Sequence, residues 1–242
     1  MATNQRRNTP AVPPSKERRR RKNLSPSDTM WYWATAWFHL SQRVIYLGSE
    51  TTDVEGSESA VDAGMAKSFE ISMRALEHAD KKGPITIIMN NPGGNWYHGM
   101  AIYDRITDSP CHVTVIGTGH VMSMASIILQ AADKRLLSRN ATILLHSGSN
   151  GFFGHSLDFN RAADENKRIL SDMEQIYLGR MIEKDPTSTL DKVRQLVQFD
   201  SYMDPTKAIR LGLADGLTPR TKHKKRRAIP PANTVITPPT PE

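Results

Sequence analysis

The chain has 242 residues, of which 38% are hydrophobic and 24% charged, and its formal net charge is +7. This composition is typical of a globular protein with one large core or two small ones, and it excludes a protein embedded in a membrane. No apolar run reaches the roughly 18 residues that a spanning helix needs. The single cysteine, Cys111, excludes an internal disulfide framework and a cysteine-rich zinc site, and fits a reducing compartment.

The charge is unevenly distributed along the chain. Residues 1–27 carry eight Lys or Arg and one Glu, residues 218–242 carry six and one, and residues 28–217 carry 18 basic and 23 acidic side chains. Ten of the fifteen prolines also lie in the two terminal segments. Segments so poor in large apolar residues cannot offset chain entropy by burial. We therefore predict one domain over 28–217 between two disordered basic tails.

Each tail has a basic run, Arg18–Lys22 and Lys222–Arg227, which permits two interpretations. The runs could contact nucleic acid or another anionic surface through its phosphates, or they could be solvated segments that keep the protein soluble. The second interpretation is favoured. Residues 1–27 lack the hydrophobic core of a secretory signal, and their prolines oppose the amphipathic helix of an organellar transit peptide, so we expect the protein in the cytoplasm.

Strand-like and helix-like patterns alternate between residues 43 and 217. Short β-branched runs predict strands at Arg43–Leu47, Ile85–Asn90, Val113–Gly117 and Thr142–His146. Apolar residues at steps of three and four predict helices over Val61–Asp80, Met100–Ile106, Met124–Ala132, Ile169–Tyr177 and Leu190–Val197, with a short one from Asp204 to Gly212. This alternation predicts an α/β body in one domain.

The first notable strand-to-helix junction is Asn91-Pro92-Gly93-Gly94, directly after the strand Ile85–Asn90. Paired glycines permit a tight turn and leave backbone N–H groups uncovered, and these groups can bind an anion or a developing oxyanion. Such a turn is more often structural than catalytic, so the pattern alone leaves both interpretations open.

The second junction contains Ser123, between the strand Val113–Gly117 and the helix Met124–Ala132. A serine at the start of a buried helix lies in the positive field of that terminus, which suits a nucleophile. The alternative is a serine that only caps the helix. Ser126 is a rival nucleophile, but it falls inside the helix and faces away from the junction.

His146 closes the strand Thr142–His146 and precedes the flexible run Ser147-Gly148-Ser149. At the rim of the core, its imidazole is either a general base or a hydrogen-bonded edge residue. A third partner would be a carboxylate, and Asp200 is one candidate among many acids. Spacing alone does not select it.

Taken in order, these segments resemble the ClpP family, the proteolytic subunits of the Clp (caseinolytic) proteases. The resemblance extends from about Arg43 to Leu217. It rests on Asn91-Pro92-Gly93-Gly94 with Gly99–Asp104, then Ser123-Met124, Ile143–His146, Asp200–Met203 and Gly212–Asp215.

The resemblance implies a serine endopeptidase that cleaves unfolded proteins or peptides. Ser123 falls on the family's nucleophile, His146 on its general base and Asp200 on the acid that orients the base. The amides of Gly94 and Met124 fall on the oxyanion hole. This set is chemically coherent, since a serine is activated by an imidazole that a carboxylate holds in one tautomer. No metal or organic cofactor is required.

The resemblance also implies a crotonase-like body of repeated β-β-α units with a projecting handle. Gly148–Phe159 resembles the strand of this handle, and Asp164–Glu183 resembles its helix. In the family the handle pairs two seven-membered rings into a closed chamber, and an AAA+ ATPase threads unfolded chains into it. We therefore expect a homo-oligomer, a heptameric ring with or without a stacked second ring, and an ATPase unfoldase as partner.

Some residues depart from the family pattern. Ala125 replaces a glycine, Ser147-Gly148 replaces Gln-Pro, and Phe199 replaces an arginine that commonly couples ring pairing to activity. Tryptophans also crowd before the first strand, either in a helix packed on the body or as a docking patch. These are Trp31, Trp33 and Trp37.

Three other functions remain as alternatives. The basic tails motivate a viral or phage maturation protease of the same fold. A non-catalytic ring subunit or nucleic-acid-associated scaffold would carry the three residues as a relic. An acyl-CoA enzyme of the crotonase superfold is disfavoured, because it would not need serine, histidine and aspartate at these positions.

Overall fold

The computed structural model describes residues 38–48, 60–149, 151 and 155–220. The tryptophan cluster and nearly all of both basic tails fall outside these ranges, so the predictions about them and about the domain boundaries remain predictions. Within the described ranges, no helix combines the length and the apolar character needed to cross a membrane.

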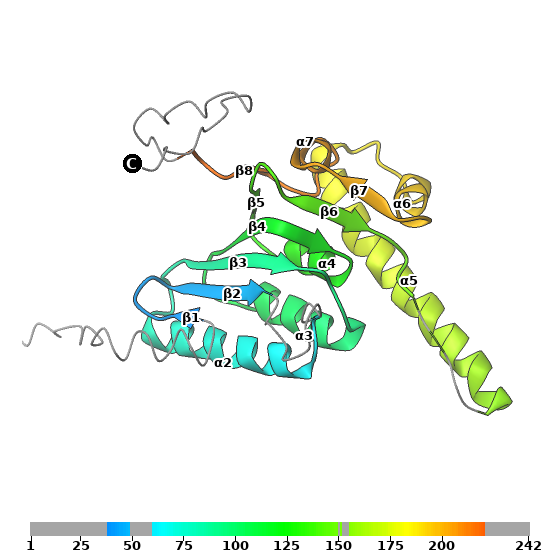
Figure 1. The fold of residues 1–242 in the computed structure, drawn as a ribbon, viewed down its shortest axis with the longest axis horizontal. Helices are drawn as coiled ribbons and strands as arrows, with labels where there is room; N and C mark the ends of the chain where they lie inside the picture. The colour runs from blue at the N-terminus through cyan, green and yellow to red at the C-terminus, as the bar shows by residue number, and fades with distance from the viewer. Residues whose placement is uncertain (1–37, 49–59, 150, 152–154, 221–242) are drawn as a thin grey trace, which may run out of the picture.

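A mixed sheet forms the centre of the molecule (Figure 1). Its main path runs β1-β2-β3-β4-β5-β8, and every pair on this path is parallel except β1 with β2. The strands are β1 (Phe38–His39), β2 (Val44–Gly48), β3 (Ile85–Asn91), β4 (Val113–Met122), β5 (Lys134–Leu137) and β8 (Gly216–Leu217). The predicted α/β class and all four predicted strands are confirmed.

The sheet forks at β4. The residues Thr114–Gly117 pair with β5, whereas His120–Met122 pair with β6 (Thr142–Leu145). A short strand, β7 (Ser201–Met203), then pairs antiparallel with β6. The second partner explains why β4 continues five residues beyond the predicted end at Gly117, because those residues find hydrogen-bonding partners there.

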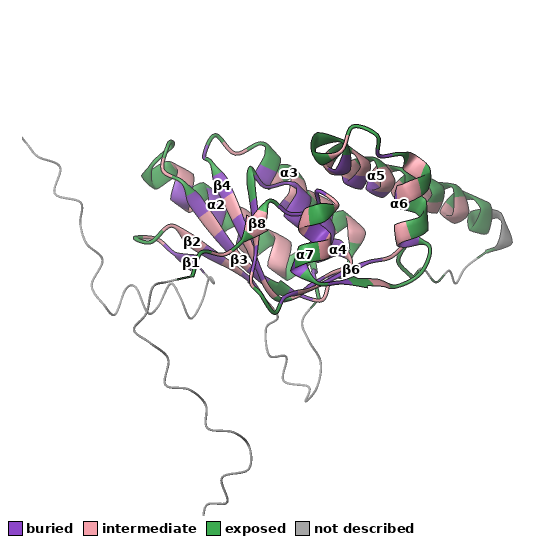
Figure 2. Ribbon diagram, turned by 90° about the horizontal axis from the view of Figure 1, so that it is seen from above, coloured by how far each residue is buried: buried purple, intermediate pink, exposed green. Residues whose placement is uncertain are grey.

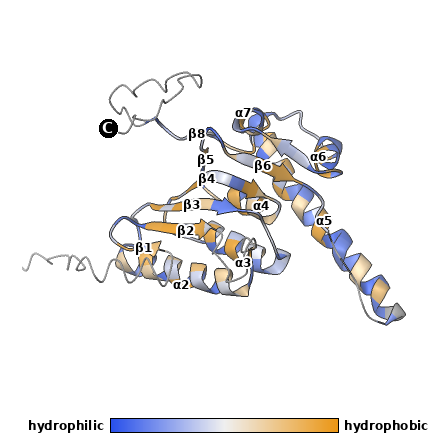
Figure 3. Ribbon diagram, in the orientation of Figure 1, coloured by the Kyte–Doolittle hydropathy of each residue, from blue (hydrophilic) through white to orange (hydrophobic). Residues whose placement is uncertain are grey.

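Three helices lie along one side of the sheet (Figure 2): α2 (Ala63–Ala79), α3 (Trp96–Thr107) and α4 (Met124–Gln130). In β2 and β3, fully buried side chains alternate with less buried ones, as expected when helices cover one face. The predicted helix over Val61–Asp80 is confirmed as α2. Its apolar residues Phe69, Met73 and Leu76 are buried, and Met65 packs against the core. Hydrophobic residues predominate in β2 and in the first part of β3 (Figure 3).

A long helix, α5 (Ser156–Lys184), projects from the body (Figure 1). Among the α5 residues whose burial is described, the buried ones are Met173, Tyr177 and Met181, all in the C-terminal half. The projecting half is largely hydrophilic (Figure 3). The C-terminal half also contacts α6 (Leu190–Val197). The last helix, α7 (Pro205–Arg210), begins as predicted after the N-cap Asp204.

The projecting helix fits the predicted handle, but the end of the predicted handle strand, Ser156–Phe159, belongs to the helix instead. Ser156–Phe159 form the first turn of α5, and Gly148, Ser149 and Gly151 belong to no strand. Asp158 favours the helix, because a carboxylate stabilises a helix N-terminus. A strand also needs a neighbour for its backbone groups, and no described strand pairs with this segment.

Candidate active site

Three candidate residues lie at the ends of adjacent strands. Ser123 follows β4, His146 follows β6, and Asp200 precedes β7. The strands β4 and β6 are parallel, and their last pair is Met122 with Leu144. The strands β6 and β7 are antiparallel, with Leu145 opposite Ser201. Ser123, His146 and Asp200 are the next residues beyond these pairs, so the three lie side by side. The fork of the sheet therefore assembles positions that are far apart in the sequence.

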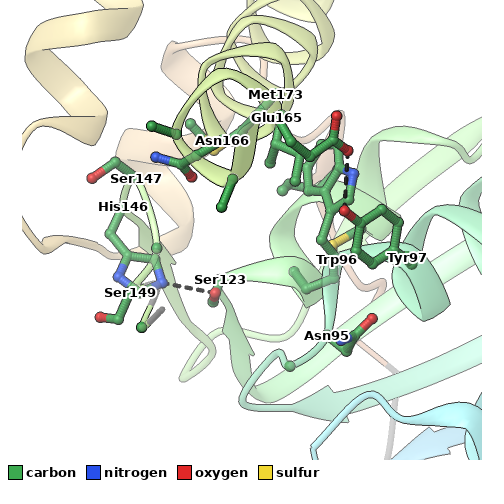
Figure 4. Close-up of a pocket in the computed structure, with 18 of the residues that line it drawn as sticks. Asn95, Trp96, Tyr97, Ser123, His146, Ser147, Ser149, Glu165, Asn166 and Met173 are labelled. Carbon is green, nitrogen blue, oxygen red and sulfur yellow. Dashed lines mark hydrogen bonds between the residues drawn. The ribbon is translucent and has the colours of Figure 1, made fainter. Parts of the chain in front are cut away.

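The imidazole of His146 lies between the other two side chains. Its Nε2 is 2.7 Å from Ser123 Oγ, and its Nδ1 is 3.3 Å from Asp200 Oδ1. Figure 4 shows the ring directed toward the serine hydroxyl. A carboxylate beside Nδ1 favours the tautomer with its proton there, which leaves the Nε2 lone pair toward the hydroxyl. The geometry therefore suits transfer of the hydroxyl proton to His146.

Ser123 has an unusual backbone conformation, with φ 50° and ψ −125°. A non-glycine residue in such a region costs about 1–3 kcal/mol, which the surrounding structure must supply. Its N–H donates to the carbonyl of Leu144 at 2.9 Å, and its own carbonyl accepts from the N–H of Ser126 at 2.9 Å. Its side chain makes no capping bond to α4, so the interpretation of Ser123 as a mere helix cap is wrong.

The glycine pair lies against this turn. A Cβ atom on Gly93 would come within 2.6 Å of Ser123 Cβ, and one on Gly94 would come within 2.4 Å of the nitrogen of Val61. Their φ angles are 106° and 144°, in the region that favours glycine. The structural interpretation of the Pro-Gly-Gly turn therefore holds, because only glycine fits between Val61 and the serine turn.

Two backbone N–H groups face this region from different segments. Met124 is the first residue of α4, and the first N–H groups of a helix have no intrahelical acceptor. Gly94 forms a parallel bridge with Val61, in which the carbonyl of Gly93 and the N–H of Asn95 make the bonds. The N–H of Gly94 itself points to the other side of this bridge.

A cavity of about 760 Å³ opens beside Ser123, bounded by α3, α4, α5 and the residues after β6. Gly94, Met124 and His146 line it together with Ser123, whereas Asp200 is absent from its lining and lies behind the imidazole. Much of the remaining wall is apolar. These side chains are Trp96, Ile127, Phe159, Ala162, Ala163, Ile169 and Met173.

A polar contact joins α3 to α5 across the cavity. Tyr97 Oη donates to Glu165 Oε1 at 3.0 Å, and Arg168 donates to the same carboxylate through two nitrogens at 2.9 and 2.7 Å. The bonds from Arg168 and then Tyr97 lower the pKa of Glu165 from 4.5 to about 2. The bond to Glu165 raises the pKa of Tyr97. In Figure 4, Tyr97 and Glu165 lie across the cavity from His146.

Sequence reasoning missed this contact. Tyr97 and Glu165 are separated by 68 positions, and no local pattern connects them. In the part of the chain that the structure describes, no group of three or more His, Cys, Asp or Glu could hold a metal ion.

Comparison with known proteins identifies the family. A family model for Clp protease matches residues 40–222, which is well over half of the chain. The ATP-dependent Clp protease proteolytic subunit of Deinococcus radiodurans is 29% identical over 188 residues, which cover 77% of this chain and 85% of that protein. The predicted resemblance is thereby confirmed, and the α/β body with its projecting helix is consistent with the fold of the family. The chain belongs to the Clp protease family and is a protease.

Proposed function

We propose that this chain is a serine endopeptidase in which Ser123 is the nucleophile, His146 the general base and Asp200 the residue that orients the base. The observation that carries this proposal is the distance of 2.7 Å between Ser123 Oγ and His146 Nε2. The carboxylate at 3.3 Å from the other ring nitrogen supports it.

In the first half of the reaction, His146 Nε2 takes the proton of Ser123 Oγ as this oxygen attacks the peptide carbonyl carbon. Asp200 stabilises the imidazolium that forms. The N–H groups of Gly94 and Met124 donate to the negative oxygen of the tetrahedral intermediate, and one such donor is typically worth about 3–4 kcal/mol. The carbon–nitrogen bond then breaks as His146 returns the proton to the leaving amine.

In the second half, His146 accepts a proton from a water molecule that attacks the acyl-serine ester. The intermediate collapses, His146 protonates Ser123 Oγ, and the carboxylic acid product leaves. Both halves use the same three side chains and the same two N–H donors, so substituting any one of them slows acylation and deacylation together.

The cavity supports an extended peptide as substrate. A volume of about 760 Å³ holds a few side chains, not a folded domain. The apolar wall formed by Trp96, Ile127 and Met173 would bury apolar side chains of the substrate. The proposed substrates are therefore unfolded proteins or peptides.

We further propose that the chain works in a homo-oligomeric ring with an ATPase unfoldase. The name of the Deinococcus relative describes that protein as a proteolytic subunit of an ATP-dependent protease, which supports this proposal. Exposed aromatic side chains support an assembly: Phe159 is 57% exposed, Phe199 74% and Tyr202 59%. The last two flank Asp200. A mass measurement in solution distinguishes a monomer, one heptameric ring and two stacked rings.

A fluorophosphonate probe tests the catalytic assignment. We expect covalent labelling of the wild type, no labelling of Ser123→Ala, and loss of labelling in His146→Ala. Ser68→Ala, in α2, is the matched control and should be labelled like the wild type. Labelling that survives Ser123→Ala would refute the assignment.

A further inference from the structure

Two buried hydroxyl groups behind the catalytic serine have no role in the proposed reaction. Ser126 on α4 is 0% exposed and Tyr177 on α5 is 1% exposed. The two hydroxyl oxygens lie 2.7 Å apart, and Ser126 Oγ also lies 2.7 Å from the carbonyl oxygen of Ser123. Buried hydroxyl groups are costly unless they are hydrogen-bonded, so this arrangement needs a physical account.

The direction of these bonds follows from proton counting. The hydroxyl of Ser126 has one proton, and the carbonyl of Ser123 can only accept, so Ser126 donates to that carbonyl. Tyr177 must then donate to Ser126 Oγ. Burial raises the pKa of Tyr177 far above its usual value, although the bond with Ser126 opposes this shift, so the phenol keeps its proton. The two hydroxyls therefore form a donor chain that ends on the Ser123 carbonyl.

This carbonyl belongs to the peptide unit that joins Ser123 to Met124. A trans peptide unit is planar, and its C=O and N–H point in opposite directions. The donor chain and the N–H of Ser126 hold the carbonyl toward the protein interior. The same bonds therefore orient the N–H of Met124 away from the interior, and they restrain the unusual ψ of Ser123.

We propose that Ser126 and Tyr177 are positioning residues, whose hydroxyl chain fixes the Ser123–Met124 peptide plane and thereby orients both the nucleophile and one oxyanion donor. This inference rests on the proposed function of Ser123 and Met124. It also excludes Ser126 as a rival nucleophile, because its hydroxyl is buried and its proton is engaged.

The same chain connects the catalytic turn to the projecting helix. Tyr177 lies on α5, and one turn further along α5 the Arg180 guanidinium donates to the carbonyl of Gln130 at the end of α4, with Nε at 2.9 Å. Both ends of α4 are thus bonded to α5. A shift of the C-terminal half of α5 would be transmitted to the Ser123 carbonyl through the hydroxyls of Tyr177 and Ser126.

Three variants of the full-length protein test the proposal: Ser126→Ala, Tyr177→Phe and the double variant. We measure kcat and KM for a peptide substrate, together with the thermal midpoint. Ser126→Ala should lower kcat about tenfold, with KM unchanged, because a loosened donor costs part of its transition-state bond. Tyr177→Phe should lower kcat only about twofold to threefold, because Ser126 still donates to the carbonyl.

The double variant separates positioning from stability. Ser126→Ala alone strands the buried phenol of Tyr177 without its partner, so its thermal midpoint should fall by several degrees. Tyr177→Phe in the same chain removes the stranded group, and the midpoint should recover. The Ser123 carbonyl still lacks its hydroxyl donor, so kcat should stay as low as in Ser126→Ala. Recovery of kcat together with the midpoint would overturn the proposal.

Ser72→Ala is the matched control. Ser72 is also a fully buried helical serine whose hydroxyl donates to a backbone carbonyl, that of Ser68 at 2.8 Å, but it lies in α2. This variant should lower the midpoint and leave kcat unchanged. If the wild type is labelled at Ser123 and Ser126→Ala retains wild-type kcat, only this inference fails. If the wild type is not labelled at Ser123, the proposed function fails and this inference with it.

Discussion

The two walls of the cavity differ in how they are held. The wall with Ser123 and His146 rests on paired strand ends and on a turn restrained by buried hydrogen bonds. The opposite wall is the projecting half of α5, where many side chains are exposed. Its polar contact with α3 is the exposed hydrogen bond from Tyr97 to Glu165, whereas the ion pair of Arg168 with Glu165 lies within α5 itself. An exposed hydrogen bond of this kind is screened by solvent and contributes little to holding α5 in place. The wall with Ser123 and His146 is therefore held more firmly than the α5 wall.

This difference separates two kinds of effect. Under the proposed function, changes in the wall with Ser123 and His146 displace the reacting groups, so they should act on kcat. Changes in the α5 wall alter only the fit of the peptide, so they should act on KM. The predictions below test this separation, beginning with the largest expected effect.

Asp200→Asn should lower kcat about 10³–10⁴-fold with little change in KM. An amide beside His146 Nδ1 would favour the tautomer with its proton on Nε2, and it would not stabilise the imidazolium. Steady-state peptide hydrolysis measures both constants. Asp204→Asn is the control, since Asp204 caps α7 by accepting from the N–H of Lys207 at 2.7 Å and asparagine caps equally well. A kcat that is equally low in both variants would contradict the assignment of Asp200.

Gly93→Ala should lower kcat about 100-fold, because the added methyl would approach Ser123 Cβ to 2.6 Å and displace the serine turn. The φ of 106° adds strain, so the thermal midpoint should fall as well. Gly179→Ala is the control: this glycine lies on the exposed face of α5 with no heavy atom within 4 Å of an added Cβ. It should retain activity and melt at the same or a slightly higher temperature.

Glu165→Gln should raise KM about twofold to fivefold and leave kcat unchanged, because it weakens the contact of α5 with Tyr97 without touching the reacting groups. Glu174→Gln offers a matched control on the same helix, where the carboxylate meets Arg194 at 3.2 Å outside the cavity. A large loss of kcat in Glu165→Gln would show that the two walls are not independent.

The titration of Glu165 gives the smallest effect. Its pKa is lowered from 4.5 to about 2, so its bonds to Arg168 and Tyr97 are fully present above about pH 4.5 and are lost as the pH falls toward 2. A carbon-13 NMR titration of the side-chain carboxyl should therefore show a midpoint well below that of an ordinary glutamate. An Arg168→Gln variant should move the midpoint back up. An ordinary midpoint in the wild type would contradict the contact.

Local patterns predicted the parts of the site that follow directly from strand and helix ends. Ser123 and His146 come immediately after apolar strands, so their positions could be found from periodicity and strengthened by the family resemblance. Asp200 could not be selected from the residues alone, because only the antiparallel pairing of β6 with β7 places it beside His146. Such pairing depends on contacts between distant segments, which short patterns do not encode.

The same limit explains the other differences. The hydrogen bond between Tyr97 and Glu165 joins helices far apart in the sequence, and no local sequence pattern around either residue predicts it. The resemblance predicted a strand over Gly148–Phe159, whereas in the structure α5 already begins at Ser156. The position of Ser126 inside a helix was predicted and is confirmed, but its complete burial and its partner Tyr177 were not predicted.

Because the sheet forks at β4, the three proposed catalytic side chains are not all held in place by the same strand pairing. His146 and Asp200 lie at the ends of β6 and β7, which form a two-stranded ribbon, so a movement of this ribbon would preserve the distance between them. Ser123 belongs to the main sheet and meets that ribbon along a seam of only three residue pairs. If β4 and β6 separated slightly, the hydroxyl of Ser123 would move away from the imidazole, while the imidazole would keep its contact with Asp200. The protein would then be inactive but still folded.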